Sequence, residues 1–295
     1  MAFGLLGVLS FSLTLPATRL AVASLDPMMV GLGRGLAAAC LAAPLLWLTR
    51  QRWPTRPQIR SLAVVALGVI VGFPVLSAWA MRHANASHGA VVLGLLPLAT
   101  ALAGALRTHE RPSLAFWVSS AAGSLTVIVF ALSTGGGSPC LADAALLGAV
   151  IAAALGYAEG GRLARELGGW QVISWAVVLA SPFLLPPLAW LAWKHGLHAT
   201  PTSWAGFAYL SFVSSFLGFF AWYHGLAVGG VARVSQLQLL QPFLTLAFAA
   251  LFFGERFGAG GFACAGLVAA SVHLNRRSRI SHALPPAGTA GSLAK

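Results

Sequence analysis

Long stretches without charged residues, separated by short charged segments, form the main pattern along the chain. Stretches without Lys, Arg, Asp or Glu cover residues 1–18, 61–81, 86–106, 112–142, 167–193, 195–232, 234–254 and 257–275. Two further apolar stretches, 28–49 and 143–160, hold only one or two charges each. A helix needs ~20 residues to cross the hydrocarbon of a bilayer. The pattern therefore predicts an all-α polytopic membrane protein with ten transmembrane helices.

The composition excludes a water-soluble fold. The 295 residues are 58% hydrophobic and only 8% charged, whereas soluble domains carry about 25% charged residues. Three scattered cysteines, Cys40, Cys140 and Cys264, form no CxxC pair and no His/Cys ligand spacing. We therefore expect no disulfide framework, no metal site and no cofactor.

The two ends of the chain need separate consideration. Ala21-Val22-Ala23 resembles a signal-peptidase site after the first apolar stretch. Because no Lys or Arg precedes that stretch and Arg19 lies near its end, we expect a retained first helix, with a cleaved signal peptide as the alternative. The segment 278–295, with Pro285-Pro286 and a Gly/Ser/Ala-rich remainder, is expected to be a disordered cytoplasmic tail.

Basic residues between the helices predict the orientation. Cytoplasmic loops of membrane proteins carry an excess of Lys and Arg. With ten helices, twelve basic residues fall on the side that holds both termini, and three fall on the other side: Arg82, Lys194 and Arg256. Both termini are therefore expected in the cytoplasm, with the protein in the inner membrane. The net charge of +12 then reflects topology and attraction to anionic lipid, and nucleic-acid binding is not expected.

The two halves of the chain resemble each other at a shift of about 143 to 145 residues. The matches include Arg19-Leu20-Ala21 with Arg162-Leu163-Ala164, Ala78-Trp79 with Ala221-Trp222, Pro97 with Pro242, Thr100 with Thr245, and Glu110-Arg111 with Glu255-Arg256. Because five helices per half is an odd number, equivalent helices must run in opposite directions. The prediction is two inverted five-helix repeats, 1–137 and 138–277, an architecture that gives transporters alternating access.

The predicted fourth helix of each half has a Pro followed by an apolar stretch and a Glu. The second copy reads Gln241-Pro242-Phe243-Leu244-Thr245 through Gly254-Glu255-Arg256, and the first copy has His109-Glu110 in place of Gly-Glu. Over residues 1–275 the chain resembles the EamA type of the drug/metabolite transporter superfamily. The resemblance implies a transporter that moves small metabolites, often amino acids, commonly outward across the bacterial inner membrane. It does not identify the substrate, since the superfamily also holds importers and nucleotide-sugar carriers.

The predicted ninth helix carries the clearest polar stripe. At 100° per residue, five residues lie within an arc of about 120°: Ser235, Gln238, Gln241, Pro242 and Thr245. Pro242, like Pro97 in the first half, is expected to break its helix, and it should free the carbonyl near residue 238. The stripe either lines a substrate cavity or makes hydrogen bonds that hold neighbouring helices together.

The predicted eighth helix offers a matching face of Ser211, Ser214, Ser215, Gly218 and Trp222. This face either lines the cavity or forms a packing seam of small residues. Trp79 and Trp222 occupy equivalent repeat positions near opposite mouths of the bundle. There they could gate a cavity by stacking, or belong to the tryptophan belts of the membrane interface.

Arg34 is expected about six residues, ~9 Å, inside the second helix. A buried arginine costs on the order of 3 kcal/mol or more unless it is paired or hydrated, so the side chain should face the bundle interior. It could bind a substrate carboxylate through two hydrogen bonds. Alternatively, it could extend outward or pair with Asp26, Asp143 or Glu255.

Residues able to couple transport to protons are few. Glu159 is the one carboxylate well inside an apolar stretch, and its expected partner is Arg162, three residues further on. His224 and His88, at helix ends, could titrate in a range suited to proton transfer or make structural hydrogen bonds. Proton-coupled exchange and uniport both remain open.

The sequence thus favours an exporter of small metabolites working by alternating access. A proton-coupled drug or metabolite antiporter or importer is the first alternative. A lipid-modifying enzyme would need paired acidic or His/Asp motifs, which this sequence lacks. A non-transporting bundle would equally accommodate the GxxxG patterns at Gly31/Gly35, Gly68/Gly72 and Gly156/Gly160. The expected partners are a small-molecule metabolite and the lipid bilayer, with the chain a monomer or homodimer.

Overall fold

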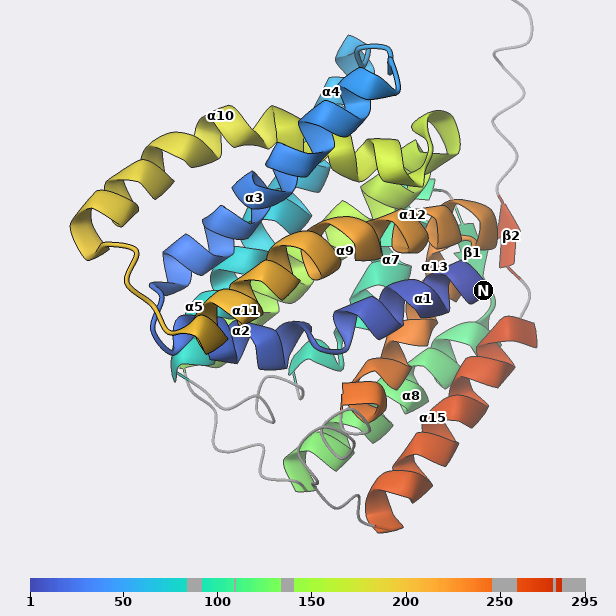
Figure 1. The fold of residues 1–295 in the computed structure, drawn as a ribbon. Helices are drawn as coiled ribbons and strands as arrows, with labels where there is room; N and C mark the ends of the chain where they lie inside the picture. The colour runs from blue at the N-terminus through green and yellow to red at the C-terminus, as the bar shows by residue number, and fades with distance from the viewer. Residues whose placement is uncertain (84–91, 109, 134–140, 246–258, 278–279, 283–295) are drawn as a thin grey trace, which may run out of the picture.

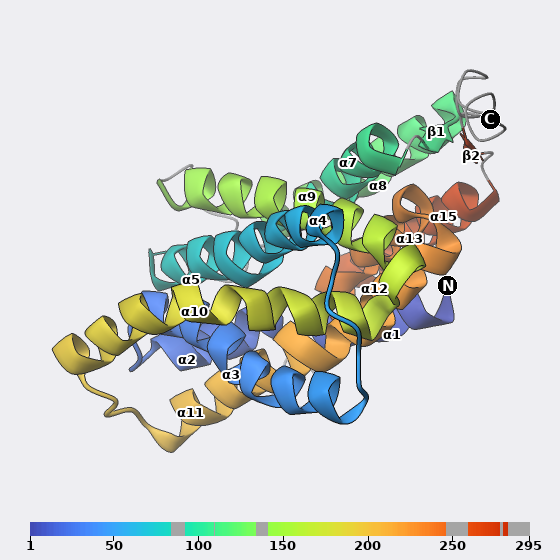
Figure 2. The same ribbon diagram turned by 90° about the horizontal axis from the view of Figure 1, so that it is seen from above.

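The computed structural model describes residues 1–83, 92–108, 110–133, 141–245, 259–277 and 280–282. These residues form a bundle of long helices (Figures 1 and 2). Six described helices are long and apolar enough to cross a membrane: Ala2–Val22, Pro27–Leu48, Arg56–His83, Leu141–Leu167, Gly169–His195 and Pro201–Gly229. The other four predicted stretches also contain helix, but their described parts are too short or too polar for this count. Ten transmembrane helices therefore stay a prediction.

The helices follow one another along the chain with short connections. In the first half they are α1 (Ala2–Phe11), α2 (Thr14–Val22), α3 (Pro27–Leu48), α4 (Arg56–Val65), η1 (Ala66–Gly72), α5 (Phe73–His83), α7 (Leu96–Thr108) and α8 (Leu114–Ser133). In the second half they are α9 (Leu141–Leu167), α10 (Gly169–His195), α11 (Pro201–Ala208), η2 (Tyr209–Leu217), α12 (Gly218–Gly229), α13 (Val231–Ser235), η3 (Gln236–Leu240) and α15 (Ala259–Arg277). The helix α9 is longer than the predicted 143–160, and the described α8 lies within the predicted 112–142.

Polar caps and prolines begin several helices. The Asp26 carboxylate accepts hydrogen bonds from the backbone N–H groups of Met28 and Met29, at 2.9 and 3.2 Å, ahead of α3. Thr200 caps α11 in the same way, through Ser203 N–H. In both cases the next residue is proline, whose missing N–H costs nothing in a first helical turn.

Departures from α-helical geometry recur at matching places in the two halves. The π-helical segments η1 and η2 begin at residues 66 and 209, a separation equal to the 143-residue shift in the sequence. A turn at residues 94–95 precedes Pro97, and the 3₁₀ segment η3 (236–240) precedes Pro242. Isolated π and 3₁₀ segments within long helices often mark functional sites or hinges.

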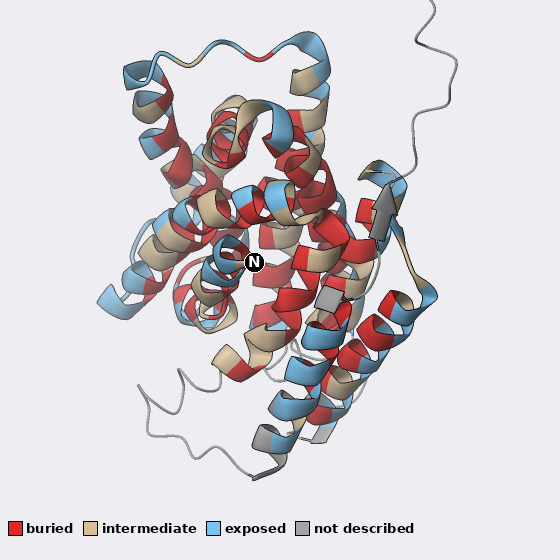
Figure 3. Cartoon of the chain, turned by 90° about the vertical axis from the view of Figure 1, so that its right-hand side faces the viewer, coloured by how far each residue is buried: buried red, intermediate tan, exposed pale blue. Residues whose placement is uncertain are grey.

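The helix contacts show the same correspondence. The second predicted helix, α3, packs on the seventh, α10, and the fifth, α8, packs on the tenth, α15. The pair α1 and α12 corresponds to the pair α9 and α5, and both pairs are in contact. Figure 3 shows buried residues in the bundle interior and exposed ones on its outer faces. Large apolar side chains such as Phe183 and Trp193 are exposed there, as lipid-facing residues would be.

The three GxxxG patterns pack within the chain. A Cβ atom on Gly68 of η1 would lie 2.4 Å from the backbone oxygen of Ala152 in α9. A Cβ atom on Gly160 would meet the ring of Tyr223 at 2.3 Å, and one on Gly31 would meet Val75 at 2.8 Å. Close helix approach inside one chain therefore explains these glycines without a second copy.

A short strand pair corrects two expectations. Strand β1 (Glu110–Pro112) pairs antiparallel with β2 (Ile280–His282), so that Glu110 faces His282 in the register. The fold is therefore not purely α-helical. The prediction of a disordered tail from residue 278 is wrong for residues 280–282, because their backbone groups find hydrogen-bond partners on β1. The remainder of that tail lies outside the described residues.

We predict that Gly68→Ala lowers the midpoint of thermal unfolding in detergent. The added methyl group collides with backbone atoms of α9 that cannot rotate away, and overpacking of this kind costs about 1–3 kcal/mol. Gly266→Ala is the matched control, since nothing lies within 4 Å of a Cβ atom there. Equal midpoints for Gly68→Ala and the wild type would contradict the contact between η1 and α9.

Candidate functional site

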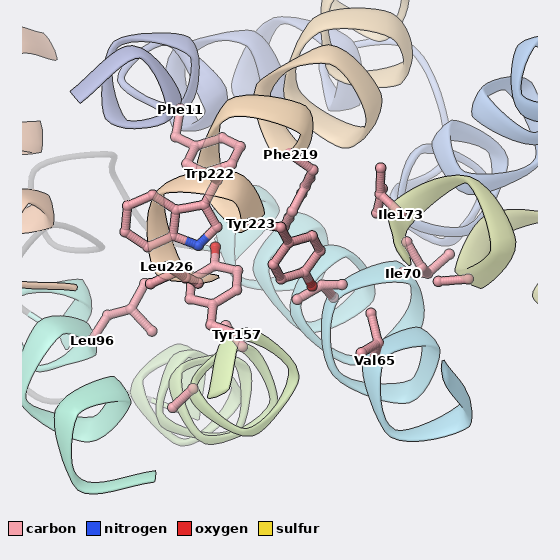
Figure 4. Close-up of a cluster of buried hydrophobic side chains, with 14 of the residues drawn as sticks. Phe11, Val65, Ile70, Leu96, Tyr157, Ile173, Phe219, Trp222, Tyr223 and Leu226 are labelled. Carbon is pink, nitrogen blue, oxygen red and sulfur yellow. The ribbon is translucent and has the colours of Figure 1, made fainter. Parts of the chain in front are cut away.

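Tyr157 of α9 lies at the centre of a buried polar cluster. Its ring is 5.5 Å from that of Trp222 and 5.9 Å from that of Phe219. Figure 4 shows the Tyr157 hydroxyl pointing toward the Trp222 indole. The same hydroxyl interacts electrostatically with the Arg34 guanidinium and with the Gln238 side chain. We call Arg34, Tyr157, Trp222 and Gln238 the Tyr157 cluster.

Polar atoms of this cluster lack hydrogen-bond partners. Arg34, Trp222 and Gln238 are 3%, 0% and 4% exposed. Arg34 Nε, Trp222 Nε1 and both amide atoms of Gln238 find no partner at hydrogen-bonding geometry in the described structure. Leaving a buried donor or acceptor unsatisfied costs about 1–3 kcal/mol. Such groups are rare in folded proteins and call for an explanation, which a bound ligand would supply.

The polar stripe predicted for residues 235–245 divides into structural and unpartnered members. Ser235 donates to the Pro97 carbonyl at 3.3 Å, Gln241 donates to the Phe11 carbonyl at 3.2 Å, and Thr245 donates to the Ser12 carbonyl. These three residues join helices, as in the second interpretation of the stripe. Gln238 alone among the polar side chains of the stripe makes no hydrogen bond of normal geometry in the described structure, although it interacts with the Tyr157 hydroxyl.

The backbone explains this division. Residues 236–240 are 3₁₀-helical, so the 100° spacing assumed for the stripe does not hold there. The Gln238 carbonyl accepts a hydrogen bond from the N–H of Gln241. The expectation that Pro242 frees this carbonyl is therefore wrong. Pro97, whose carbonyl anchors Ser235, lies buried at the start of α7, directly after the turn at 94–95.

Sequence reasoning missed Gln236, which is fully buried. Its amide nitrogen donates to the Pro97 carbonyl at 3.2 Å, and its oxygen accepts from Asn275 of α15 at 3.3 Å. Two glutamines two residues apart in an apolar stretch were the available signal. Only the structure shows that Gln236 is structural while Gln238 is unpartnered.

The predicted face of residues 211–222 is mostly a packing seam. Ser214 shares a hydrogen bond of 2.9 Å with Thr14 of α2, and Ser211 donates to the Phe207 carbonyl at 2.7 Å. A Cβ atom on Gly218 would lie 3.0 Å from Phe11. Ser215 differs, because its buried hydroxyl has no described partner.

The two tryptophans differ in burial. Trp222 is fully buried, with Phe11 and Tyr157 against its ring. It therefore does not belong to a tryptophan belt at the membrane interface, and gating by Trp222 stays a prediction. Trp79 is partly exposed and lies against the His83 ring, with 4.4 Å between ring centroids. Gating by Trp79 stays a prediction.

Arg34 has none of the predicted partners among the described residues. It does not extend outward, because it is almost fully buried. Asp26 caps the first turn of α3 instead of pairing with it, and the structure shows no ion pair from Arg34 to Asp143. Glu255 lies outside the described residues. The guanidinium interacts electrostatically with the Tyr157 hydroxyl and has no described carboxylate partner.

Glu159 belongs to a charged network at one end of the bundle. Its carboxylate lies 2.7 Å from Arg162 and 3.6 Å from Arg107 of α7. Arg162 also pairs with Glu166 at 3.0 Å and donates to Ser61 of α4 at 2.8 Å. The predicted Glu159–Arg162 pair is confirmed, and the network additionally joins α9 to α4 and α7.

Glu110 connects the two halves at this end. Its carboxylate accepts hydrogen bonds from the backbone N–H groups of Val231 and Ala232, at 2.9 and 2.8 Å, and lies 3.4 Å from Arg165. A carboxylate at a helix N-terminus satisfies its free N–H groups and the positive end of the helix dipole. A residue between α7 and α8 of the first half thus fixes the start of α13 in the second.

Of the two predicted histidines, the structure describes only His224. His224 is exposed, with its ring edge-on to Phe3 at 4.4 Å, and His88 lies outside the described residues. Within the described ranges, no group of three or more His, Cys, Asp or Glu side chains could hold a metal ion.

A model of the EamA-like transporter family matches residues 1–132 and 141–277. The chain belongs to this family. It is 49% identical over 263 residues to the uncharacterized transporter YdeK of Bacillus subtilis (strain 168), with 86% of this chain and 89% of the relative covered. The resemblance found in the sequence is thereby confirmed. This EamA-family protein is a multi-pass membrane transporter.

Two further similarities are more distant. The EamA-family chain is 29% identical over 206 residues, 68% of each protein, to a probable terminal-alkyne amino-acid exporter of Streptantibioticus cattleyicolor. A protein of known crystal structure is 16% identical, with a TM-score of 0.75 over 93% of this chain and 96% of that one. At that identity the second comparison supports the fold alone.

We predict that Glu110→Ala destabilises the protein far more than Glu166→Ala. The first change leaves two buried N–H groups at the start of α13 unpaired, a loss of about 2–4 kcal/mol. The second removes a pair from a half-exposed carboxylate, which is worth ~0–1 kcal/mol. Thermal unfolding midpoints in detergent measure both changes. Equal midpoints for the two variants would contradict the capping role of Glu110.

Proposed function

We propose that this transporter exports small metabolites such as amino acids across the inner membrane by alternating access. The observation that carries the proposal is the Tyr157 cluster. It buries the Arg34 Nε, the Trp222 indole N–H and the Gln238 amide, which have no described hydrogen-bond partners. Arg34 comes from the first half of the chain, while Tyr157, Trp222 and Gln238 come from the second. A ligand bound there would contact both halves, as alternating access requires.

The repeated irregularities support ten helices in two inverted repeats, 1–137 and 138–277. The π-helical segments, the breaks before Pro97 and Pro242, and the paired helix contacts recur at the sequence shift. Broken helices at equivalent positions of two repeats are typical of substrate sites near the middle of the bilayer. Local bending at these breaks would let one part of each repeat move against the other.

The charged network supports a cytoplasmic location for the end of the bundle that contains it. The network gathers Arg107, Arg162 and Arg165 around the carboxylates of Glu110 and Glu159. Basic residues are enriched on the cytoplasmic side of membrane proteins. With ten helices, both termini then lie in the cytoplasm. The Arg162–Ser61 hydrogen bond that joins α9 to α4 and the Arg107–Glu159 ion pair that joins α9 to α7 would have to part for the cluster to open on this side.

Amino acids are the proposed cargo because a relative is named as a probable amino-acid exporter. The aromatic rings of Phe11, Phe219 and Trp222 would receive an apolar side chain. Proton coupling is the second candidate mechanism. Its support is that Glu159 is a nearly buried carboxylate paired with arginines. A proton bound to this carboxylate could replace the arginine pairing during transport.

We predict saturable flux of L-phenylalanine through purified protein in lipid vesicles, and a loss of about tenfold in this flux for Gln238→Ala. The amide has no protein hydrogen bond to lose, so the variant should keep the wild-type unfolding midpoint. One lost ligand hydrogen bond of ~1.4 kcal/mol corresponds to a tenfold change.

Gln236→Ala is the matched control, because that amide holds Pro97 and Asn275. It should lower the unfolding midpoint, and the folded fraction should keep its substrate affinity. An absence of saturable flux of any amino acid in wild-type vesicles would contradict the proposed function. Full flux in Gln238→Ala would place the site elsewhere. Dependence of the flux on an imposed pH gradient, lost in Glu159→Gln, would establish proton coupling.

A further inference from the structure

The Tyr157 cluster carries a positive charge that no described carboxylate balances. The chain has six Asp and Glu residues in total, so each one can be considered. Asp26 caps α3, and Glu110 caps α13 and pairs with Arg165. Glu159 and Glu166 both pair with Arg162. These four carboxylates are committed elsewhere.

The remaining two acids are Asp143 and Glu255. Asp143 lies in the first turn of α9, fourteen residues before Tyr157 on the same helix, a separation of ~21 Å along the axis. Glu255 lies outside the described residues, and the sequence repeat matches it to Glu110, at a helix end. The Arg34 guanidinium therefore has no protein counter-charge within the described structure, although it is almost fully buried.

The unpartnered groups of the cluster favour an acceptor. Arginine and the tryptophan indole can only donate hydrogen bonds, and the Gln238 amide adds a further donor. A guanidinium binds a carboxylate through two parallel hydrogen bonds, and charge-assisted bonds of this kind are strengthened by burial. Aromatic rings of Phe11, Phe219 and Trp222 lie beside the donors. An anion with an apolar tail satisfies both features.

An ammonium group finds no charged partner in the cluster. Within the described structure, the unpartnered acceptor of the cluster is the neutral Gln238 amide oxygen, and the positive charge of Arg34 would repel a second cation. A zwitterionic amino acid would therefore gain more from its carboxylate than from its amino group.

We propose that the Tyr157 cluster binds the carboxylate of a monocarboxylate anion with an apolar or aromatic tail, at Arg34, and does not require an amino group on the substrate. This assignment rests on the proposed transport function and narrows its substrate class. N-acylated amino acids and aryl-alkyl carboxylates then become substrates alongside free amino acids.

Ligand-induced shifts of the unfolding midpoint test binding separately from transport. The probes are 3-phenylpropionate, N-acetyl-L-phenylalanine, L-phenylalanine and L-phenylalaninamide, each added to the detergent-purified wild type. We expect 3-phenylpropionate and N-acetyl-L-phenylalanine to stabilise the protein at concentrations at least tenfold lower than L-phenylalaninamide. Free L-phenylalanine should act at a concentration between those of the anions and that of the amide. The same order is expected for inhibition of labelled 3-phenylpropionate flux in vesicles.

Arg34→Gln and Arg34→Lys test the residue itself. The glutamine variant should need a concentration of 3-phenylpropionate on the order of 100-fold higher for the same midpoint shift. The lysine variant should recover part of this loss. Without ligand, Arg34→Gln should unfold at or above the wild-type midpoint, because it removes an unpaired buried charge. A purely structural arginine would give the opposite result. Arg19→Gln, at an exposed position of α2, is the control.

The outcomes separate the two proposals. Equal stabilisation by acid and amide, or an unchanged shift in Arg34→Gln, overturns the carboxylate assignment even if amino acids are transported. Anion binding at Arg34 without flux of any probe overturns the transport function of the site and leaves the binding assignment standing. If 3-phenylpropionate causes neither a shift nor flux in the wild type, the carboxylate assignment is wrong.

Discussion

Every polar group that a membrane protein carries into hydrocarbon must find a partner inside the protein, because the lipid offers none. Most of the polar side chains in this bundle obey that constraint. Thr14 bonds Ser214, Gln241 bonds the Phe11 carbonyl, and Gln236 bonds both Pro97 and Asn275. These bonds join segments that are distant in the sequence. The polar residues of the interior therefore help to set the helix arrangement as well as to satisfy one another.

The Tyr157 cluster departs from that constraint, and its position follows from the rest. The irregular segment η2 leads into α12, which carries Trp222, and η3 itself contains Gln238. Because η3 is 3₁₀-helical, Gln236 makes structural hydrogen bonds while Gln238 stays unpartnered. A regular α-helix would have directed Gln238 and Gln241 to the same side. Unpartnered polar groups thus occur beside the backbone breaks, where a transporter needs both a ligand site and a hinge.

Much of the fold could be predicted from the sequence, because its determinants are local or periodic. Uncharged stretches predicted the helices, and the Pro97/Pro242 repeat predicted matching breaks. The Glu159–Arg162 pair followed from helical spacing. The β1–β2 pairing was missed because three residues of an apparently unstructured tail carry no strand pattern of their own.

The site was harder to predict, because partnership depends on contacts between distant segments. Arg34, Gln238 and Trp222 were expected among the site residues, yet Ser235, Gln241 and Thr245 have the same polar character and prove to be structural. No sequence periodicity reveals that the Phe11 carbonyl accepts a hydrogen bond from Gln241. Tyr157 lies in a helix of small apolar residues and is one of only three tyrosines, a signal that could have identified it as the centre of the cluster.

Photo-crosslinking tests the central claim, that substrate binds at the Tyr157 cluster, most directly. The measurement uses a diazirine analogue of L-phenylalanine with the purified protein in lipid vesicles, followed by mass spectrometry of the labelled peptides. Labelling should fall on α9 around Tyr157 and on α12 around Trp222, and excess unmodified ligand should suppress it. Competed labelling confined to other helices, such as α8 and α15, would contradict the claim.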